Sequence, residues 1–301
     1  MAESVVRALY GKATSLNLSS KKMKDVPTCI STITNLSVLL LKNNAITTLP
    51  AELSNLQHLS VLDNKLEEVP AELGHLTKLS EINLTSNKLS WLPQQLCQCK
   101  DLTRLHVARN QLTSLPEVGH FSGNMFGLSS HLKTMKELFF SLLCFCDFSL
   151  FALVKLQVMD VAGNKLTIFP IEFHLLPLKE LHCEGNRFLH CEPLPSVQDV
   201  EVLTLKELVA RFALLEDRNR SSLVHRNLPH YPCLTALLAN SSCCALCLGP
   251  FLTTWLECVH FISLKKDMKM RSSLTIPVRA LLCSYKCFNT DGHSYYGVAT
   301  R

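Results

Sequence analysis

The sequence predicts an α/β fold: a solenoid of stacked repeats with parallel strands on its concave face, followed by a small C-terminal module of helix and cysteines. Two observations predict the solenoid. Prolines recur at steps of 20 or 23 residues, and the residues ahead of them repeat one apolar pattern; these prolines are Pro27, Pro50, Pro70, Pro93 and Pro116. Paired cysteines beyond residue 240 predict the module. A period near 23 indicates units that bury their apolar faces against their neighbours.

The repeated pattern is LxxLxLxxNxLxxLP. It reads LSVLLLKNNAITTLP at 36–50, LSEINLTSNKLSWLP at 79–93, LTRLHVARNQLTSLP at 102–116 and LQVMDVAGNKLTIFP at 156–170. This pattern resembles the leucine-rich repeat. Its central LxL predicts a short strand whose leucines point inward, because successive side chains of a strand face opposite sides. With a first copy around Leu16 and Leu18 and a last copy, LKELHCEGNRF, at 178–188, the chain should form seven repeats.

Two further positions of the repeat have a physical role. An asparagine follows each strand, where a buried amide can satisfy the backbone groups of neighbouring turns; this column is Asn44, Asn64, Asn87, Asn110, Asn164 and Asn186. The proline should begin a short convex helix, because proline is tolerated at the first helical position.

Two repeats depart from the pattern. In LSVLDNKLEEVP (59–70) the segment from Leu62 to Leu66 is three residues shorter than the segment from Leu39 to Ile46 in the second repeat. We therefore expect a damaged strand, with a kink or a weak stack. The step from Pro116 to Pro170 is 54 residues, one period of 23 plus 31 more.

The additional residues predict a hydrophobic insert at 117–154, which ends in the 17-residue run LFFSLLCFCDFSLFALV (138–154) with Asp147 in its middle. Three interpretations remain open. The run could be a membrane span, although it is short and carries a charge. It could be a helix packed on the solenoid. It could also be an alternative-exon product that was not selected to fold, which would promote aggregation.

The concave strand positions form the predicted partner surface, because a solenoid offers a curved face. They are mixed in charge and poor in aromatic residues, which favours a polar protein partner. The outward positions are Leu40, Lys42, Asn83, Thr85, His106, Ala108, Asp160, Ala162, His182 and Glu184, flanked by Glu81 and Arg104. No catalytic arrangement is expected among them, and His106 and His182 are expected to be three strands apart.

Composition restricts the kind of partner and the compartment. The net charge is +5 and no Lys/Arg cluster occurs, so we expect neither nucleic acid nor a membrane as partner. The N-terminal MAESVVRALYGK has no long apolar stretch typical of a secretory signal. Fourteen cysteines without such a signal predict reduced thiols or metal ligands in the cytoplasm or nucleus.

Beyond the repeats, TLKELVARFALL (204–215) predicts an amphipathic helix. Thr204 and Glu207 form a capping box, T-x-x-E. One apolar stripe follows at helical spacing; its members are Leu205, Leu208, Val209, Phe212 and Leu215. Burial of this stripe against the last repeat would make the helix a cap of the solenoid.

The same helix also resembles the BC-box by which substrate receptors bind elongin C. Thr204, Leu205 and Leu208 match, and Val209 stands where that family has Cys. Downstream, LPHYPCLTALL (228–238) resembles a cullin box; its matching residues are Leu228, Pro229, Pro232, Leu234, Leu237 and Leu238. Together the two boxes resemble the VHL-type box of cullin-2 ubiquitin ligase receptors, which would make the solenoid a substrate reader.

Two pairs of cysteines predict a metal site. Cys244 and Cys247 are spaced C-x-x-C, and Cys283 and Cys287 are spaced C-x-x-x-C. Four thiolates suit a tetrahedral structural zinc, which stabilises a module with a small core. Cys243 and Cys258 are alternative ligands and His260 a weaker one. Buried reduced thiols without metal are the other interpretation.

The segments VAGNKLTIFP, LHCEGN, CALC, WLECVHF (255–261) and CSYKCF (283–288), in this order and spacing, resemble an intracellular leucine-rich repeat family. The resemblance implies a repeat protein without enzymatic activity, and no P-loop, nucleophile elbow, HExxH or dinucleotide glycine motif occurs. We therefore expect a solenoid at 1–188, a tail at 189–301, and a non-enzymatic protein-interaction scaffold. The alternative is the substrate-recognition subunit of an elongin/cullin ubiquitin ligase.

Overall fold

The computed structural model describes residues 2–11, 13–116, 153–171, 173–189, 202–219, 221–290 and 292–299. Nearly all of the predicted insert therefore lies outside the described residues, and its three interpretations remain predictions. By its contacts the chain divides into two compact units. One unit contains the repeats together with Ser263–Leu274, and the other contains most of the tail.

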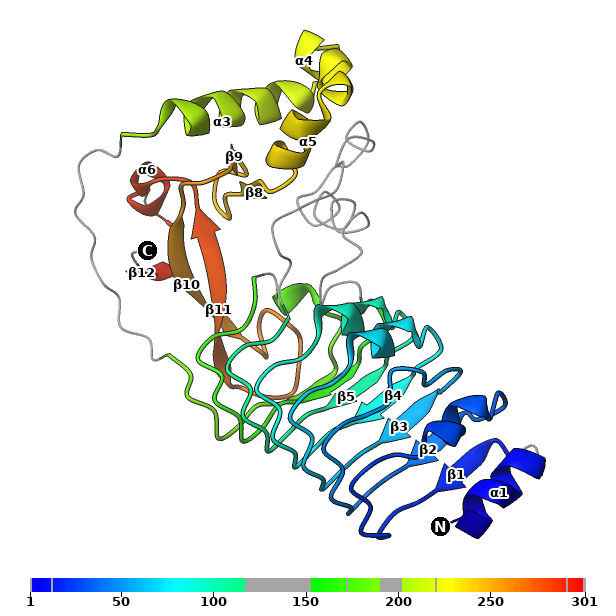
Figure 1. Ribbon diagram of the computed structural model, residues 1–301. Helices are drawn as coiled ribbons and strands as arrows, with labels where there is room; N and C mark the ends of the chain where they lie inside the picture. Colours follow the sequence, from blue (N-terminus) through cyan, green and yellow to red (C-terminus); the bar gives the residue numbers. More distant parts are fainter. Residues whose placement is uncertain are drawn as a thin grey trace. The chain divides into compact units, whose positions relative to one another are not determined.

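Seven strands form one parallel sheet in chain order, which confirms the seven predicted repeats (Figure 1). They are β1 (Ser15–Asn17), β2 (Val38–Leu40), β3 (His58–Ser60), β4 (Glu81–Asn83), β5 (Arg104–His106), β6 (Val158–Asp160) and β7 (Glu180–His182). The middle residue of each strand is aligned with the middle residue of the next, and every one of them is buried. Stacking thus buries leucines that a single repeat would leave in water.

The asparagine column forms the predicted ladder of hydrogen bonds. Asn110 is typical: its Oδ1 accepts a bond from the N–H of Leu89 at 3.0 Å, and its Nδ2 donates to the carbonyls of Leu84 at 3.0 Å and Val107 at 2.9 Å. Leu84 and Leu89 belong to the preceding repeat, so each amide joins two successive repeats. The same pattern holds at Asn44, Asn64, Asn87, Asn164 and Asn186.

The residue before each asparagine of the column has a left-handed backbone, with φ between 52° and 68°. These residues are Asn43, Asp63, Ser86, Arg109, Gly163 and Gly185. Glycine adopts this conformation without the steric cost that a side chain brings, so the last two turns fit their backbone better than the others do.

The convex side carries short 3-10 helices after the prolines: η1 (Thr28–Thr32), η2 (Ala71–His75), η3 (Gln94–Gln98) and η5 (Phe173–Leu175). The prediction of proline at the first helical position was wrong by one residue. Pro70 and Pro93 have extended backbones, with ψ of 141° and 137°, and precede the helix. Proline suits the residue before the helix because its fixed φ is compatible with an extended backbone.

The predicted damage to the third strand is also wrong. β3 pairs with β2 and β4 in the same register as its neighbours, and Leu59 and Val61 are fully buried. The three missing residues fall instead in the convex segment between Pro50 and Leu56, where no 3-10 helix forms. A shorter convex segment leaves the strands intact, because β3 and its asparagine turn are held by their own hydrogen bonds to the neighbouring repeats.

Helix α1 (Ala2–Tyr10) precedes the first repeat and was not predicted. Its Val5 and Ala8, three residues apart, are buried, and the helix contacts β1 and η1. The helix thus covers the N-terminal end of the apolar core, as a terminal repeat requires.

The tail contains α3 (Leu205–Asp217), α4 (Leu223–Asn227), η6 (Leu228–His230) and α5 (Pro232–Leu238), followed by the β8 (Ser242–Cys243) and β9 (Pro250–Phe251) pair. A second sheet has the order β11-β10-β12. Its strands are β10 (Leu256–Ser263), β11 (Thr275–Leu282) and β12 (Tyr295–Ala299), and α6 (Tyr285–Phe288) follows β11. Among the described residues, no helix is long and apolar enough to cross a membrane.

Candidate metal centre and interaction surfaces

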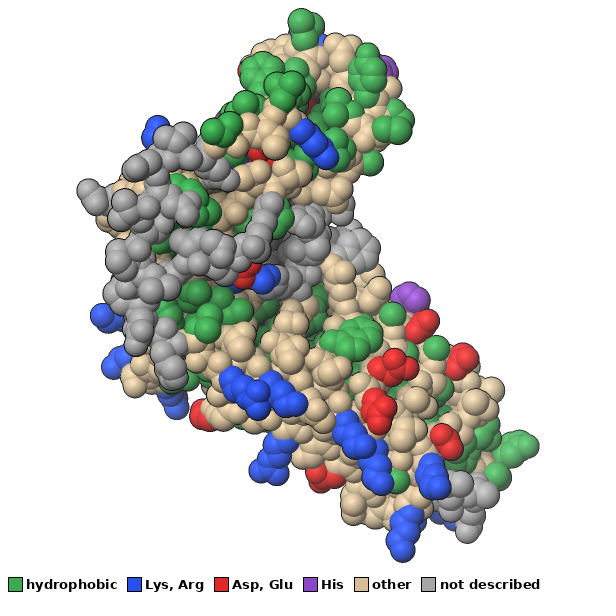
Figure 2. All heavy atoms as spheres, turned by 60° about the vertical axis from the view of Figure 1, so that its left-hand side comes forward, with side chains coloured by type: hydrophobic (Ala, Val, Ile, Leu, Met, Phe, Trp, Pro, Cys, Tyr) green, Lys and Arg blue, Asp and Glu red, His purple; other side chains and the backbone are tan. Residues whose placement is uncertain are grey.

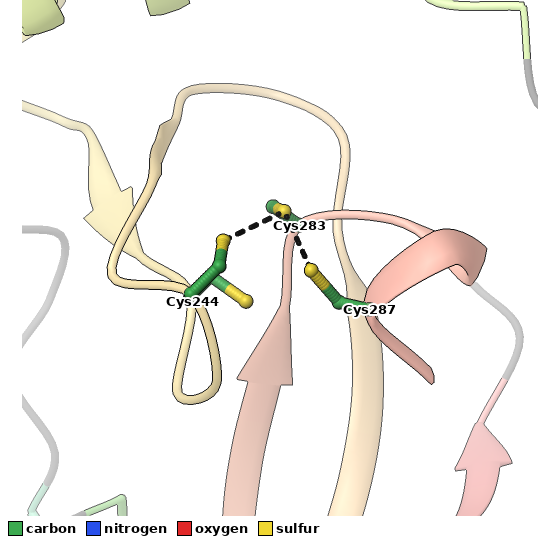
Figure 3. Close-up of side chains that lie close together, drawn as sticks. Cys244, Cys283 and Cys287 are labelled. Atoms are coloured by element: carbon green, nitrogen blue, oxygen red, sulfur yellow. Dashed lines mark hydrogen bonds between the residues drawn. The ribbon is translucent and has the colours of Figure 1, made fainter. Parts of the chain in front are cut away.

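The four predicted metal ligands come together in the tail. Cys244 and Cys247 lie in the turn between β8 and β9, Cys283 directly follows β11, and Cys287 lies in α6. Figure 3 shows the sulfurs of Cys244, Cys283 and Cys287 turned toward one another from these separate segments. All four sulfur atoms lie within 4.8 Å of one another.

Backbone bonds shape the two turns that carry the cysteines. In the first turn, the N–H of Leu248 donates to the carbonyl of Cys244 at 3.0 Å, and the N–H of Gly249 donates to the Cys247 sulfur at 3.3 Å. In the second, the Ser284 hydroxyl accepts from the N–H of Cys287 at 3.4 Å and begins α6. Each turn therefore holds its two thiols on the same side.

The Cys283 sulfur lies 3.5 Å from that of Cys247 and 3.5 Å from that of Cys287. Interaction with the Cys283 thiol lowers the pKa of Cys244 to about 4 against the opposing effect of burial. The same interaction, together with burial, raises the pKa of Cys283. Burial raises the pKa of Cys287 to about 11. Contacts among the thiols of the cluster, together with burial, thus cause these pKa shifts.

This donor set fits zinc. A tetrahedral zinc with Zn–S bonds of about 2.3 Å places its sulfurs about 3.8 Å apart, and the four thiols already lie within 4.8 Å of one another. Four sulfur ligands and no oxygen ligand match the preference of structural zinc and not that of magnesium or calcium.

The three alternative ligands lie elsewhere. Cys258 is buried in the β10 core, where burial raises its pKa to about 12. The Cys243 sulfur accepts a bond from Arg218 Nη2 at 3.3 Å. The Nε2 of His260 lies 2.9 Å from the Ser294 hydroxyl. None of these three belongs to the group of four sulfurs that the described residues form.

Helix α3 begins as predicted and buries the opposite face from the predicted one. The Thr204 side chain accepts from the N–H of Glu207 at 3.2 Å. The buried residues are Glu207, Ala210, Leu214 and Asp217, and Ala210 and Leu214 pack with Leu228, Leu238 and Leu252. The predicted stripe is exposed, with Leu205 at 76%, Leu208 at 50% and Phe212 at 61%.

Only one of the two hydrogen bonds of the predicted capping box forms, the one that the Thr204 side chain accepts. The Glu207 carboxylate turns away from Thr204 and accepts bonds from the N–H groups of Leu252 at 3.0 Å and Thr253 at 2.6 Å, from the Thr253 hydroxyl at 2.8 Å, and from Arg211 Nε at 2.7 Å. Burial would raise the pKa of Glu207, but these bonds outweigh it and hold the pKa below its ordinary value. The charge is therefore a structural part of the tail.

The exposed apolar side chains of the helical segment form one surface, which we call the α3 face. Leu205, Leu208, Val209, Phe212 and Leu215 supply it. Figure 2 shows hydrophobic side chains gathered over the helical part of the tail. The residues predicted to contact elongin C, including Val209, are thus accessible. Of the predicted cullin-box leucines, Leu234 and Leu237 are exposed, whereas Leu228 and Leu238 are buried.

On the concave face, the predicted residues fall into rows set by the strand register. Leu40, Asn83, His106, Asp160 and His182 share one row, and Glu81 and Arg104 share another. Two residues beyond the first row lie Lys42, Thr85, Ala162 and Glu184, which are accessible to solvent. Ala108 is buried, so its assignment to the surface was wrong.

Two predictions about the concave histidines need correction. His106 and His182 are two strands apart with Asp160 between them in register, because the insert does not separate β5 from β6 in the sheet. His58 was missed because the third repeat was misaligned. Its Nδ1 lies 3.4 Å from Glu81 Oε2, which also accepts from Arg104 Nη1 at 2.8 Å. Three adjacent strands thus carry an interacting row of charged and polar groups.

The chain is similar to curated proteins named Leucine-rich repeat-containing protein 69, which confirms the resemblance drawn from the sequence. Identity is 44% over 134 residues to the Xenopus laevis protein, 38% over 133 residues to that of Mus musculus and 33% over 123 residues to that of Homo sapiens. These matches cover 44%, 44% and 40% of this chain, and 39%, 38% and 35% of the relatives. The chain thus matches well under half the length of these relatives.

No protein-family model matches the chain. Similar solved structures include a leucine-rich repeat protein of Leptospira interrogans, 29% identical over 61% of this chain and 58% of that chain, with a TM-score of 0.35. The leucine-rich repeat domain of a Shigella effector is 18% identical over 64% of this chain and 67% of that chain, with a TM-score of 0.40. The leucine-rich repeat fold itself follows from the seven-stranded sheet and the asparagine ladder described above.

Proposed function

We propose that this chain is an intracellular, non-enzymatic scaffold that holds a protein partner on the concave face of its leucine-rich repeats. The observation that carries the proposal is the continuous register of β1 to β7, which presents accessible side chains of both charges in rows. Extended, mixed-charge surfaces of this kind suit a protein partner, because complementary charges fix orientation and register.

The test compares a concave with a convex charge reversal in the full chain. Glu81→Lys removes the acceptor that joins His58 and Arg104, and Glu72→Lys changes the same charge on the convex helix η2. Proteins that co-purify with the wild type should be lost selectively with Glu81→Lys. Equal retention by both variants would show that the concave face is not the binding surface.

We propose further that the four-cysteine cluster holds one structural zinc through Cys244, Cys247, Cys283 and Cys287. Support comes from the all-sulfur donor set, whose four sulfur atoms come from two separate turns and lie within 4.8 Å of one another. Mass spectrometry under native, reducing conditions should find one zinc per chain, lost in Cys283→Ser with Cys287→Ser and kept in the control Cys29→Ser, which changes an exposed thiol outside the cluster. Retention of zinc by the double variant would disprove the assignment.

A second candidate function is favoured by one observation, the exposure of the α3 face. Leu205, Leu208 and Val209 occupy the positions of a BC-box and lie open to solvent, so the chain could act as the substrate-recognition subunit of an elongin/cullin ubiquitin ligase. In this role the solenoid would bind the substrate, and the cullin would engage the segment that includes Leu234 and Leu237.

The test is binding of the purified full chain to the elongin B–elongin C complex by size exclusion and calorimetry. Leu205→Arg should abolish binding, because it places a charge in the centre of an apolar contact. The control is Lys206→Ala, an exposed change in the same helical turn. Absence of binding by the wild type would remove this candidate while leaving the concave scaffold untouched.

A further inference from the structure

Helix α3 is joined to both cysteine turns by two arginines of its own. Arg211 and Arg218 are seven residues apart, which places them two turns apart along one side of the helix. Arg211 Nη2 donates to the carbonyl of Cys283 at 2.9 Å, and Arg218 Nη2 donates to the carbonyl of Leu248 at 3.1 Å. Cys283 belongs to one cysteine turn, and Leu248 directly follows Cys247 in the other.

The arginine at position 211 is itself fixed in place. Its Nε donates to Glu207 Oε1 at 2.7 Å, its Nη2 also donates to the carbonyl of Thr254 at 2.9 Å, and its side chain is only 16% exposed. Glu207 in turn accepts from Leu252 and Thr253. A guanidinium that donates to several fixed acceptors holds its position better than a flexible ammonium would, because its planar fork loses little freedom on binding.

The metal site therefore lies at the far end of a short chain of charge-assisted bonds from the α3 face. A zinc ion would join the two cysteine turns, which contribute two ligands each. Each turn offers one carbonyl to an arginine, Cys283 to Arg211 and Leu248 to Arg218. The distance between these two carbonyls therefore restricts the position of the two arginines and of the helix that carries them. The apolar stripe lies on the opposite side of α3 from Glu207, Ala210 and Leu214.

We infer that Arg211 and Arg218 couple metal occupancy of the cysteine cluster to the order of α3, so that metal binding controls docking at the α3 face. For the partner, the inference rests on the docking role proposed above. For the helix, it rests on the proposed zinc site and on the hydrogen bonds of Arg211 and Arg218. Arg211 and Arg218 are positioning residues here, since neither belongs to the exposed stripe.

The experiment is hydrogen exchange of residues 205–217 in the full chain, measured with zinc and after chelation in a reducing buffer. In the wild type we expect chelation to speed exchange of α3 by about tenfold or more, the equivalent of one charge-assisted hydrogen bond. Unchanged exchange after verified loss of zinc would overturn the inference.

Arg211→Lys distinguishes coupling from general unfolding of the tail. It keeps a positive charge beside Glu207 and removes the fork that also reaches Thr254 and Cys283. We expect it to retain one zinc per chain while its α3 exchanges about tenfold faster than in the zinc-loaded wild type. Exchange identical to that of the zinc-loaded wild type would show that the bridge does not position the helix. Arg226→Lys, a change of the same chemistry in α4, is the control.

Binding of the elongin B–elongin C complex serves as the separate readout of docking. The zinc-loaded wild type should bind at least about tenfold tighter than zinc-loaded Arg211→Lys, although the stripe is the same in both. Equal binding by the wild type, Arg211→Lys and the zinc-free chain would overturn the coupling and leave docking intact. Failure of every form to bind, with the exchange results as expected, would remove only the partner.

Discussion

Buried amides and a buried carboxylate hold this molecule together at the scale of single residues. The column asparagines and Glu207 share one property: each is buried or half-buried and finds hydrogen-bond partners in a neighbouring segment. Loss of such a residue leaves its partners buried and unsatisfied, which costs more than the original bond contributed.

Asn110→Ala should lower the free energy of unfolding of the solenoid by roughly 2 kcal/mol, because it leaves the buried N–H of Leu89 without its partner and removes one of the two amides that bond the Leu84 carbonyl. Urea denaturation followed by circular dichroism measures the change. Gln111→Ala, which removes an exposed amide at the next position, should change stability by less than about 0.5 kcal/mol. Equal effects of the two variants would contradict a structural role of the ladder.

Glu207→Gln should destabilise the tail by roughly 3 kcal/mol at pH 7, since it leaves Arg211 half-buried without its counter-ion. The pKa of Glu207 is lowered in the folded state, so its contribution is present above the ordinary carboxyl pKa of about 4.3 and is lost as pH falls through the lowered value. The variant should therefore lose less stability than the wild type between about pH 5 and pH 3.

Fluorescence of Trp255, the tail tryptophan, reports this transition in a Trp91→Phe background. Glu257→Gln provides the comparison, because Glu257 and Arg279 form a partly exposed pair. A pH profile of Glu207→Gln parallel to that of the wild type would mean that the carboxylate does not titrate as its hydrogen bonds require.

At the scale of the element, helix α3 has an exposed apolar stripe opposite a buried face of mixed polarity, and the convex 3-10 helices η2 and η3 stack closely. Both features decide how the elements pack, and each predicts a contrast between neighbouring positions.

Leu214→Ala should lower the free energy of unfolding of the tail by roughly 3 kcal/mol, and Leu215→Ala by less than about 1 kcal/mol. The two residues are adjacent and identical, but Leu214 is 8% exposed and Leu215 is 51% exposed. Thermal unfolding monitored at Trp255 measures both. A larger effect at Leu215 would show that the stripe, and not the Ala210–Leu214 side, is the packed face of α3.

Gly74→Ala should destabilise the solenoid by more than about 1 kcal/mol. A Cβ at this position of η2 would lie 2.2 Å from the carbonyl oxygen of Gln95 in η3, so the two convex segments would have to separate, and overpacking of this kind is costly. Urea denaturation of the full chain tests it against Glu72→Ala in the same helix. A neutral result would show that the convex segments can shift freely.

The repeat elements could be predicted from the sequence because they obey one short-range pattern. Leu39, Leu59 and Leu105 are buried at the predicted strand centres, and the asparagines bond as expected. The error in the third repeat came from counting a three-residue deletion within the strand, although the consensus continues through Leu59, Val61 and Asn64.

The packing of α3 could not be predicted in the same way. Its apolar stripe follows helical spacing, but the buried side contains the charged Glu207, whose burial depends on Leu252 and Thr253 far along the chain. Periodicity finds an apolar stripe and does not reveal what covers it. The cysteine spacing, in contrast, predicted that Cys244, Cys247, Cys283 and Cys287 come together, because closely spaced cysteine pairs can be recognised from residue type alone.

At the scale of the whole molecule, two compact units carry separate kinds of stabilisation. The solenoid depends on stacked leucines and the asparagine ladder. The tail depends on a small core around the cysteine cluster and on the Glu207 network. A small core gains much of its stability from a bound metal.

Chelation of zinc should therefore shift only one of two unfolding transitions. We expect the midpoint reported by Trp255 to fall by roughly 10 °C or more in a Trp91→Phe background, and the midpoint reported by Trp91 in a Trp255→Phe background to stay within about 2 °C. Differential scanning fluorimetry with and without chelator makes the comparison. A parallel shift of both midpoints would show that the units unfold together.

Between β5 and β6 the polypeptide runs for one period plus 31 residues, yet Arg104 and Val158 are aligned as any other neighbours are, and Asn164 bonds Leu112 and Val107 across the gap. Insertions and deletions between β5 and β6 can therefore change the length of the chain without changing the strand register of the concave face. A descendant lacking the additional stretch would present the same strands with the same neighbours. Mutations that change length would survive selection here, whereas a single-residue slip within a strand would be eliminated.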